Sequence, residues 1–187
     1  MNPVRTKSMA LAAFAAVALT GAGCATPTKK EPTFETAAQN PFIPTNQAAA
    51  TALLGQLKGK LQANQPLIMA TLVDINVLEK SSTMGRMVSE QISAIFSQAG
   101  YRMIEMKFRD SVYMKRNEGE MLLTREITEV AKQHNAQAVV VGTYGSASDT
   151  IFINLKVVQP GTNLVLAAHD YALPMDNNIR AMLSSPR

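Results

Sequence analysis

An uninterrupted run of apolar residues constrains the fold of this chain more than any other feature. Residues Leu67–Val73 read LIMATLV, a segment of strand length without alternation of apolar and polar side chains. Such a strand is typically covered on both of its faces, as central strands of α/β sheets are. Ala138–Thr143 (AVVVGT) has the same character. The sequence therefore predicts a sheet with helices packed against it.

Three segments space their apolar residues as helices do. Gln47–Gln62 is expected to be helical until Pro66 stops it, and Thr124–Asn135 is expected to form a later helix. Thr83–Ala99 shows the clearest pattern, with a cap expected from Thr83 at its start and from Gly100 at its end. Its expected buried stripe consists of Met84, Met87, Val88, Ile92, Ile95 and Phe96.

The remaining segments favour strands. Tyr101–Phe108 alternates as a second strand, and Ser111–Met114 is expected to be a short strand or edge segment. Ile151–Val158 and Leu164–Ala172 are expected to pair as a hairpin around the turn at 160–163. We therefore predict a single α+β domain, α/β-like in its order, with a mixed sheet of four to five strands, two to three packed helices and a C-terminal β-hairpin.

The N-terminus has the pattern of an export signal. Arg5 and Lys7 precede an apolar run from Met9 to Leu19, which is shorter than the roughly 20 residues of a membrane span. Small residues then lead to Cys24, the only cysteine of the chain. This arrangement resembles a bacterial lipoprotein signal, although such signals usually place Leu where Gly21 stands. The alternative is an ordinary signal cleavage site beside an unrelated cysteine.

These features predict four regions. Residues 1–23 are expected to be a cleaved signal, 24–46 a lipidated N-terminus with a flexible, Pro- and Thr-rich tether, 47–174 the folded domain, and 175–187 a loose tail with one helical turn around residues 179–183. Cleavage leaves 164 residues (187 − 23), and the loss of Arg5 and Lys7 lowers the formal charge from +4 to +2. We therefore expect no nucleic-acid partner.

The sequence does not favour an enzyme, a metal site or a cofactor. His134 is expected on the apolar stripe near a helix end, where packing or capping is its usual role. His169 and its neighbour Asp170 are expected on opposite faces of one strand. Asp74 begins a polar crest after the first strand, in a position where α/β sheets often bind ligands, although such residues more often form a capped loop. Zinc, phosphate-loop and serine-hydrolase motifs are absent from the sequence.

Residues 102–116 carry a cluster of basic side chains, among them Arg102, Lys107 and Arg116. One interpretation is a patch for acidic lipid headgroups, peptidoglycan carboxylates or a partner protein. The other is a solvated strand edge, where charge prevents edge-to-edge aggregation. The second interpretation is favoured.

Three segments together resemble one family. Residues 71–92 (TLVDINVLEKSSTMGRMVSEQI), 108–127 (FRDSVYMKRNEGEMLLTREI) and 138–158 (AVVVGTYGSASDTIFINLKVV) are similar in order and spacing to the FlgO family of flagellar outer-membrane lipoproteins. The resemblance extends from Pro66 to Pro174.

The resemblance implies a non-enzymatic protein, lipid-anchored through Cys24 on the periplasmic side of the outer membrane, that supports the flagellar basal structure and motility. It implies flagellar partners such as the FlgP lipoprotein, and assembly with further copies of itself. The residues that match the family pattern include Leu78, Gly85 and Ser111. The matching residues that form the candidate interaction surface are Asp74, Glu79, Ser81, Ser82, Arg86, Arg109, Asp110 and Tyr113. We expect Arg86 to pair with Glu79, Glu90 or Asp74.

A second interpretation is an envelope lipoprotein that binds and activates a peptidoglycan synthase or contributes to a secretion channel. The order of helices and strands also resembles that of such periplasmic lipoproteins. A periplasmic hydrolase is the least favoured class, because no nucleophile and base can be paired from their spacing.

Overall fold

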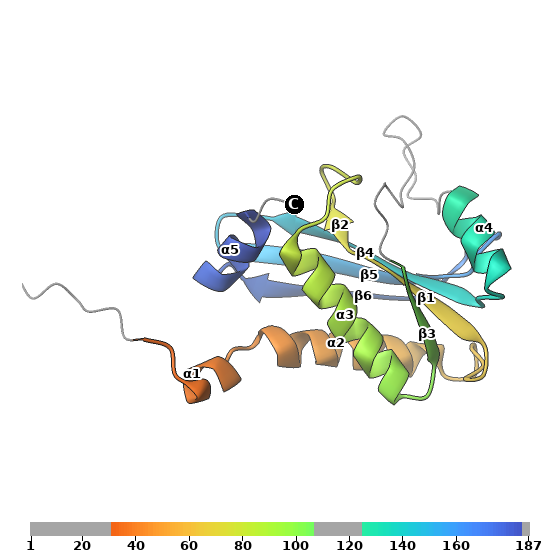
Figure 1. The fold of residues 1–187 in the computed structure, drawn as a ribbon, viewed down its shortest axis with the longest axis horizontal. Coiled ribbons are helices and arrows are strands. Elements are labelled where there is room, and N and C mark those ends of the chain that lie inside the picture. The colour runs from red at the N-terminus through yellow and green to blue at the C-terminus, as the bar shows by residue number, and fades with distance from the viewer. Residues whose placement is uncertain (1–30, 107–124, 185–187) are drawn as a thin grey trace, which may run out of the picture. The chain divides into compact units, whose positions relative to one another are not determined.

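The computed structural model describes residues 31–106 and 125–184 (Figure 1). The compact domain begins at Gln39, and the short helix α1 (Phe34–Ala38) belongs to a separate N-terminal unit. The elements of the domain are α2 (Phe42–Leu57), β1 (Pro66–Ala70), β2 (Val73–Asp74), α3 (Thr83–Gln98), β3 (Arg102–Met106), α4 (Arg125–Gln133), β4 (Ala138–Ser146), β5 (Thr150–Val158), β6 (Val165–Pro174) and α5 (Asn177–Ser184).

The strands form one mixed sheet in the order β3-β1-β4-β5-β6, with β2 also paired to β4. The β1–β3, β1–β4 and β2–β4 pairs are parallel, whereas β4–β5 and β5–β6 are antiparallel. This confirms the predicted α+β class and the C-terminal hairpin. The sheet has six strands rather than four to five, because the apolar run at 67–73 is divided between β1 and the two-residue strand β2.

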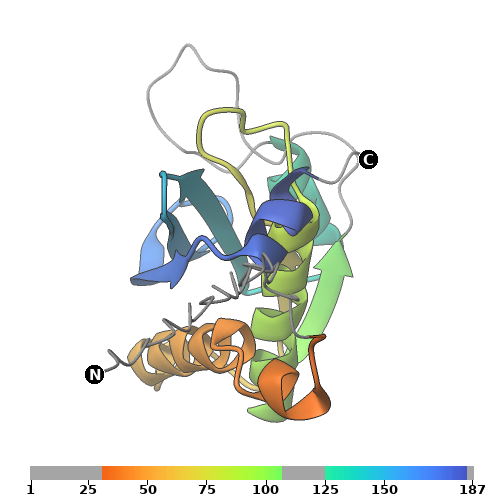
Figure 2. The same ribbon diagram turned by 90° about the vertical axis from the view of Figure 1, so that its left-hand side faces the viewer.

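Both faces of the central strands are buried, as the apolar runs predict. Leu67 and Met69 of β1 lie in one core cluster, while Ile68 and Ala70 lie in a second cluster with Ile127 and Ala131 of α4. Helices α2, α3 and α5 contribute to the first cluster (Figures 1 and 2 show these helices and α4). Strand β4 divides in the same way. Because successive side chains of a strand point to opposite faces, each of these continuous apolar strands contributes residues to both hydrophobic clusters.

The ends of α3 explain where it starts and stops. Ser82 rather than Thr83 is the N-cap, since its hydroxyl accepts a hydrogen bond from the Gly85 amide at 3.1 Å. At the other end Gly100 has φ +91°, and the Tyr101 amide donates to the Phe96 carbonyl at 3.2 Å. This is the left-handed termination that glycine allows. The predicted stripe is confirmed at Ile92 and Phe96, whereas Met87 is 38% exposed.

Helix α2 begins at Phe42, five residues before the predicted start, and ends at Leu57. Part of the expected tether, residues 42–46, therefore belongs to this helix. The reason is Asn46, which is fully buried, accepts a hydrogen bond from the Tyr171 hydroxyl at 2.5 Å and donates to Gln91 Oε1 at 2.7 Å. These bonds join α2, β6 and α3. Burial also raises the pKa of the Tyr171 phenol, because it disfavours the charged phenolate.

The C-terminal segment was expected to be loose, with a single helical turn, but α5 is an eight-residue helix packed on the domain. Asp176 caps it by accepting a hydrogen bond from the Ile179 amide at 2.8 Å, and the Ile179 side chain is buried. Arg180 donates to the Ser148 carbonyl in the β4–β5 turn at 2.8 Å. The local sequence pattern did not show the full helix, because it is held by the buried Ile179, the Asp176 cap and the long-range bond from Arg180.

Side chains of α2 and the residues after it close part of the outer edge of β6. Gln56 Nε2 donates to the Ala168 carbonyl at 2.8 Å, and Gln56 Oε1 accepts from the Ala168 amide at 3.2 Å. Lys60 Nζ donates to the Leu166 carbonyl at 2.7 Å. These bonds occupy backbone groups that an edge strand otherwise leaves unpaired.

None of the helices within the described ranges is long and apolar enough to cross a membrane. The expected strand at 111–114 lies outside the described residues, as do residues 1–30 and the signal predicted there.

Replacing Ile92 by Asp should remove the native thermal transition or lower the free energy of unfolding by more than about 3 kcal/mol, because it places an unpaired carboxylate in the core. Circular dichroism during heating measures this. The matched control is Ala94→Asp on the exposed side of α3, where we expect a loss below about 1 kcal/mol. A wild-type transition for Ile92→Asp would show that the wrong side of α3 has been assigned to the core.

Candidate functional site

The second face of the sheet is only partly covered by the described helices. Helix α4 packs over β1 and the first half of β4, where Ile127 and Ala131 contact the sheet. Beyond it, Phe152 on β5 is 59% exposed and Ile75 after β2 is 52% exposed. Large apolar side chains gathered on one exposed face commonly mark an interaction site.

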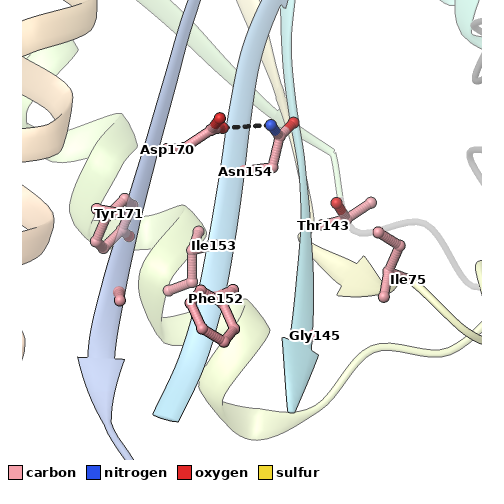
Figure 3. Close-up of a pocket in the computed structure, with 9 residues that line it drawn as sticks. Ile75, Thr143, Gly145, Phe152, Ile153, Asn154, Asp170 and Tyr171 are labelled. Atoms are coloured by element: carbon pink, nitrogen blue, oxygen red, sulfur yellow. Dashed lines mark hydrogen bonds between the residues drawn. The ribbon is translucent and has the colours of Figure 1, made fainter. Parts of the chain in front are cut away.

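These side chains surround a shallow hollow of about 510 Å³, called here the sheet hollow (Figure 3). Residues from the loop after β2 and from three neighbouring strands form it. The lining residues are Ile75, Thr143, Gly145, Phe152, Ile153, Asn154, Asp170, Tyr171 and Ala172.

Strand alternation places the outward side chains of the sheet hollow. In β5, Ile151, Ile153 and Leu155 are buried in the core, so Phe152 and Asn154 point to the opposite face. Gly145 pairs with Phe152 across the β4–β5 ladder. A Cβ atom on Gly145 would lie 3.3 Å from Cγ2 of Ile75. The lack of a side chain at 145 therefore leaves space between the two exposed apolar residues.

One charged side chain lines the sheet hollow. Asp170 pairs with Asn154 across β5 and β6, and its carboxylate accepts a hydrogen bond from the Asn154 amide group (Figure 3). This bond fixes the carboxylate at the edge of an otherwise mostly apolar surface. The arrangement suits a ligand with an apolar group next to a cation.

The histidines do not assemble a catalytic group. His169 shares a face with Tyr171, and their rings are stacked with centroids 6.1 Å apart, so His169 and Asp170 point to opposite faces as predicted. His134 is exposed just after α4 and does not pack on the apolar stripe, which corrects the expectation from helical spacing. Across the described ranges, His, Cys, Asp and Glu form no group able to hold a metal ion.

The crest at residues 74–82 is held by backbone hydrogen bonds and by its own polar side chains. Asp74 Oδ1 accepts a hydrogen bond from the Asn76 amide at 2.8 Å, and the Asp74 amide donates to the Lys80 carbonyl at 2.8 Å. Ser81 Oγ donates to the Leu72 carbonyl at 2.7 Å. Asp74 therefore forms the capped loop that the sequence favoured over an active site.

Two serines connect the start of α3 to the break between β1 and β2. Leu72 is buried outside the strands, and its amide donates to Ser89 Oγ at 2.9 Å. The Ser81 hydroxyl donates a hydrogen bond to the Leu72 carbonyl, so side chains satisfy both the amide and the carbonyl of Leu72. A Cβ atom on Gly85 would lie 2.6 Å from the Leu72 carbonyl oxygen, so this close approach requires glycine.

The structure accounts for part of the candidate interaction surface. Ser81 and Ser82 have the packing and capping roles given above, and Glu79 is exposed. Arg86 is exposed and donates from Nη2 to Thr83 Oγ1 at 2.9 Å, rather than to one of the carboxylates expected to pair with it. Arg109, Asp110 and Tyr113 lie outside the described residues, as does Cys24. The set as an interaction surface stays a prediction.

Sequence reasoning did not single out Ile75, Gly145, Phe152 or Asn154. A signal was present in IFINLKVV, where Phe152 shares the outward face with Asn154 and Lys156. A large aromatic side chain on the polar face of a strand is unusual enough to mark that face. The contribution of Ile75 depends on β2 pairing with β4 and could not be read from local pattern.

The FlgO protein family matches residues 47–178, which include all six strands. The chain belongs to the FlgO family. This confirms the resemblance carried by the three sequence segments. A search among curated proteins gives no match for this chain.

The chain is also similar to solved structures of the LpoB C-terminal domain. The Salmonella enterica domain is 12% identical with a TM-score of 0.47, and the match covers 67% of this chain and 94% of that one. The Escherichia coli domain is 12% identical with a TM-score of 0.48, covering 71% and 97%. A PelC dodecamer from Paraburkholderia phytofirmans is 8% identical with a TM-score of 0.40, covering 66% and 83%. These structural similarities describe only the backbone fold.

Gly85→Ala should lower the free energy of unfolding by about 1–3 kcal/mol, because the new methyl group would overlap the Leu72 carbonyl and force α3 away from the sheet. Chemical denaturation measures the change. Gly55→Ala in α2 is the matched control. No atom lies within 4 Å of a Cβ there, so we expect a gain of up to about 1 kcal/mol from helix propensity. Equal stability of the two variants would contradict the close approach at Gly85.

Proposed function

We propose that this FlgO-family chain is a lipid-anchored, non-enzymatic protein on the periplasmic side of the outer membrane that supports assembly or stability of the flagellar basal structure. The family match over residues 47–178 carries this proposal. The predicted export signal and Cys24 support the anchor. The exposed apolar side chains that line the sheet hollow support a binding role.

The sheet hollow is the surface proposed to contact the flagellar partner. Phe152 and Ile75 offer exposed apolar area, and Asp170 adds one fixed negative charge. The complementary ligand is a protein segment with an apolar side chain beside Lys or Arg, since a rim charge of opposite sign sets orientation. A flagellar lipoprotein such as FlgP is the proposed owner of that segment, with a second copy of this chain as the other outcome.

Deletion of the gene should reduce swimming in soft agar and leave few or unstable flagella by microscopy, with both defects restored by the intact gene. Normal swimming and normal flagella would overturn the flagellar assignment. If such a strain were instead sensitive to cell-wall antibiotics, the synthase-binding interpretation from the order of elements would replace it.

Phe152→Glu should fail to restore swimming to the deletion strain, because it removes the exposed apolar surface and adds a charge like that of Asp170. The matched control is Leu164→Glu in the β5–β6 turn, which is 57% exposed and lies outside the sheet hollow. Both proteins should be present at wild-type levels by immunoblot. Equal restoration by the two variants would exclude the sheet hollow as the contact surface.

Cys24→Ala should abolish incorporation of labelled palmitate and release the chain from the membrane fraction as a precursor or soluble form. Two or more acyl chains anchor a protein stably, and this substitution removes the atom that would carry them. Palmitate labelling at the wild-type level in the variant would refute the anchor at Cys24.

A further inference from the structure

A second hollow lies at the other end of the sheet, where β1 and β3 begin and α4 and β5 end. Its volume is about 880 Å³, and we call it the basic hollow. Three basic side chains and several amides line it, including Arg102, Lys132, His134, Asn64, Asn135 and Gln159. No carboxylate is among its described lining residues.

The basic side chains are available to a ligand. Arg102 is exposed, and its guanidinium has no hydrogen-bond or ion-pair partner within the part of the chain that the structure describes. Lys132 lies 3.5 Å from Glu129, but both side chains are about two-thirds exposed, at 66% and 64%. Such exposed pairs are weak and exchange readily with other partners.

Most carbonyl groups at the end of α4 already accept hydrogen bonds from the residues that follow the helix. The His134 amide donates to the Val130 carbonyl at 3.1 Å, and the Ala136 amide donates to the Ala131 carbonyl at 2.8 Å. Asn135, with φ 49°, allows this left-handed closure. The negative end of the helix is therefore largely satisfied internally, and the side-chain cations are the groups left for a ligand.

Gln137 holds the wall of the basic hollow in place. Its Oε1 accepts a hydrogen bond from the Gln62 amide at 2.7 Å, and its Nε2 donates to the carbonyls of Gln62 and Gln65 at 2.5 and 2.9 Å. The Gln137 amide also donates to the Pro66 carbonyl at 3.0 Å. The segment that carries Asn64 is thus fixed before a ligand arrives, which lowers the ordering cost of binding.

We propose that the basic hollow binds carboxylate groups of peptidoglycan. A guanidinium and an ammonium group suit carboxylates, and side-chain amides suit the peptide groups and hydroxyls of a glycan–peptide polymer. The inference rests on the proposed envelope location. From Cys24 to the start of α2 at Phe42 the chain has 18 steps, and with five of these residues in helix α1 their reach is about 50 Å at most. That reach would let the anchored domain contact the cell wall.

The test is co-sedimentation of the purified full chain, in detergent, with isolated peptidoglycan sacculi. We expect the double variant Arg102→Gln/Lys132→Gln to bind about tenfold more weakly, the equivalent of one good charged contact. The control is Lys58→Gln/Lys80→Gln, which removes two exposed cations outside both hollows and should change binding less than about twofold. Equal losses in the two variants, or no binding by the wild-type chain, would overturn the proposal.

Competition identifies the group that is recognised. Soluble muropeptides with free carboxylates should displace the chain from sacculi, whereas the same muropeptides with amidated carboxylates should not. Equal competition by both would contradict carboxylate recognition, and displacement only by an unrelated polyanion such as heparin would assign the hollow to another class of polymer. Sacculus binding and swimming are separate readouts, so loss of one leaves the other interpretable.

Discussion

The arrangement around Leu72 is the contact on which the rest of the domain depends. The central apolar run leaves the sheet there, and a buried backbone amide and carbonyl outside a ladder would be costly without partners. Ser89 and Ser81 supply those partners, from α3 and from the residues just before it. Because the same serines lie beside Gly85, the break in the strand and the close approach of α3 are one feature.

The break at Leu72 also determines which side chains form the sheet hollow. After the break, β2 pairs with the end of β4 and leads into the crest, which places Ile75 beside Gly145 and opposite Phe152. The sheet hollow therefore depends on side-chain hydrogen bonds that lie in the core of the protein. A substitution at Ser89 or Gly85 would therefore alter the position of Ile75 in the sheet hollow, although neither residue lines that hollow.

Much of the fold could be predicted because its signals are local. Uninterrupted apolar runs indicate β1 and β4, the turn residues at 160–163 indicate the β5–β6 hairpin, and helical spacing indicates α3 and α4. The start of α2 and the full length of α5 could not be predicted in this way. Asn46 is buried through partners far along the chain, and α5 is held by Asp176 and a single buried isoleucine. The candidate site was missed for the same reason, since its residues converge only when the strands pair.

The bonds from Gln56 and Lys60 to the outer edge of β6 affect how copies of this protein can meet. Those side chains occupy the Ala168 amide and the carbonyls of Ala168 and Leu166, which a neighbouring strand would otherwise use. A strand could join there only by displacing side chains anchored in α2 and in the turn after it. Neighbouring copies of the domain could therefore lie close together without pairing their sheets through residues 166–168 of β6. At that part of the edge each copy would remain a separately folded domain.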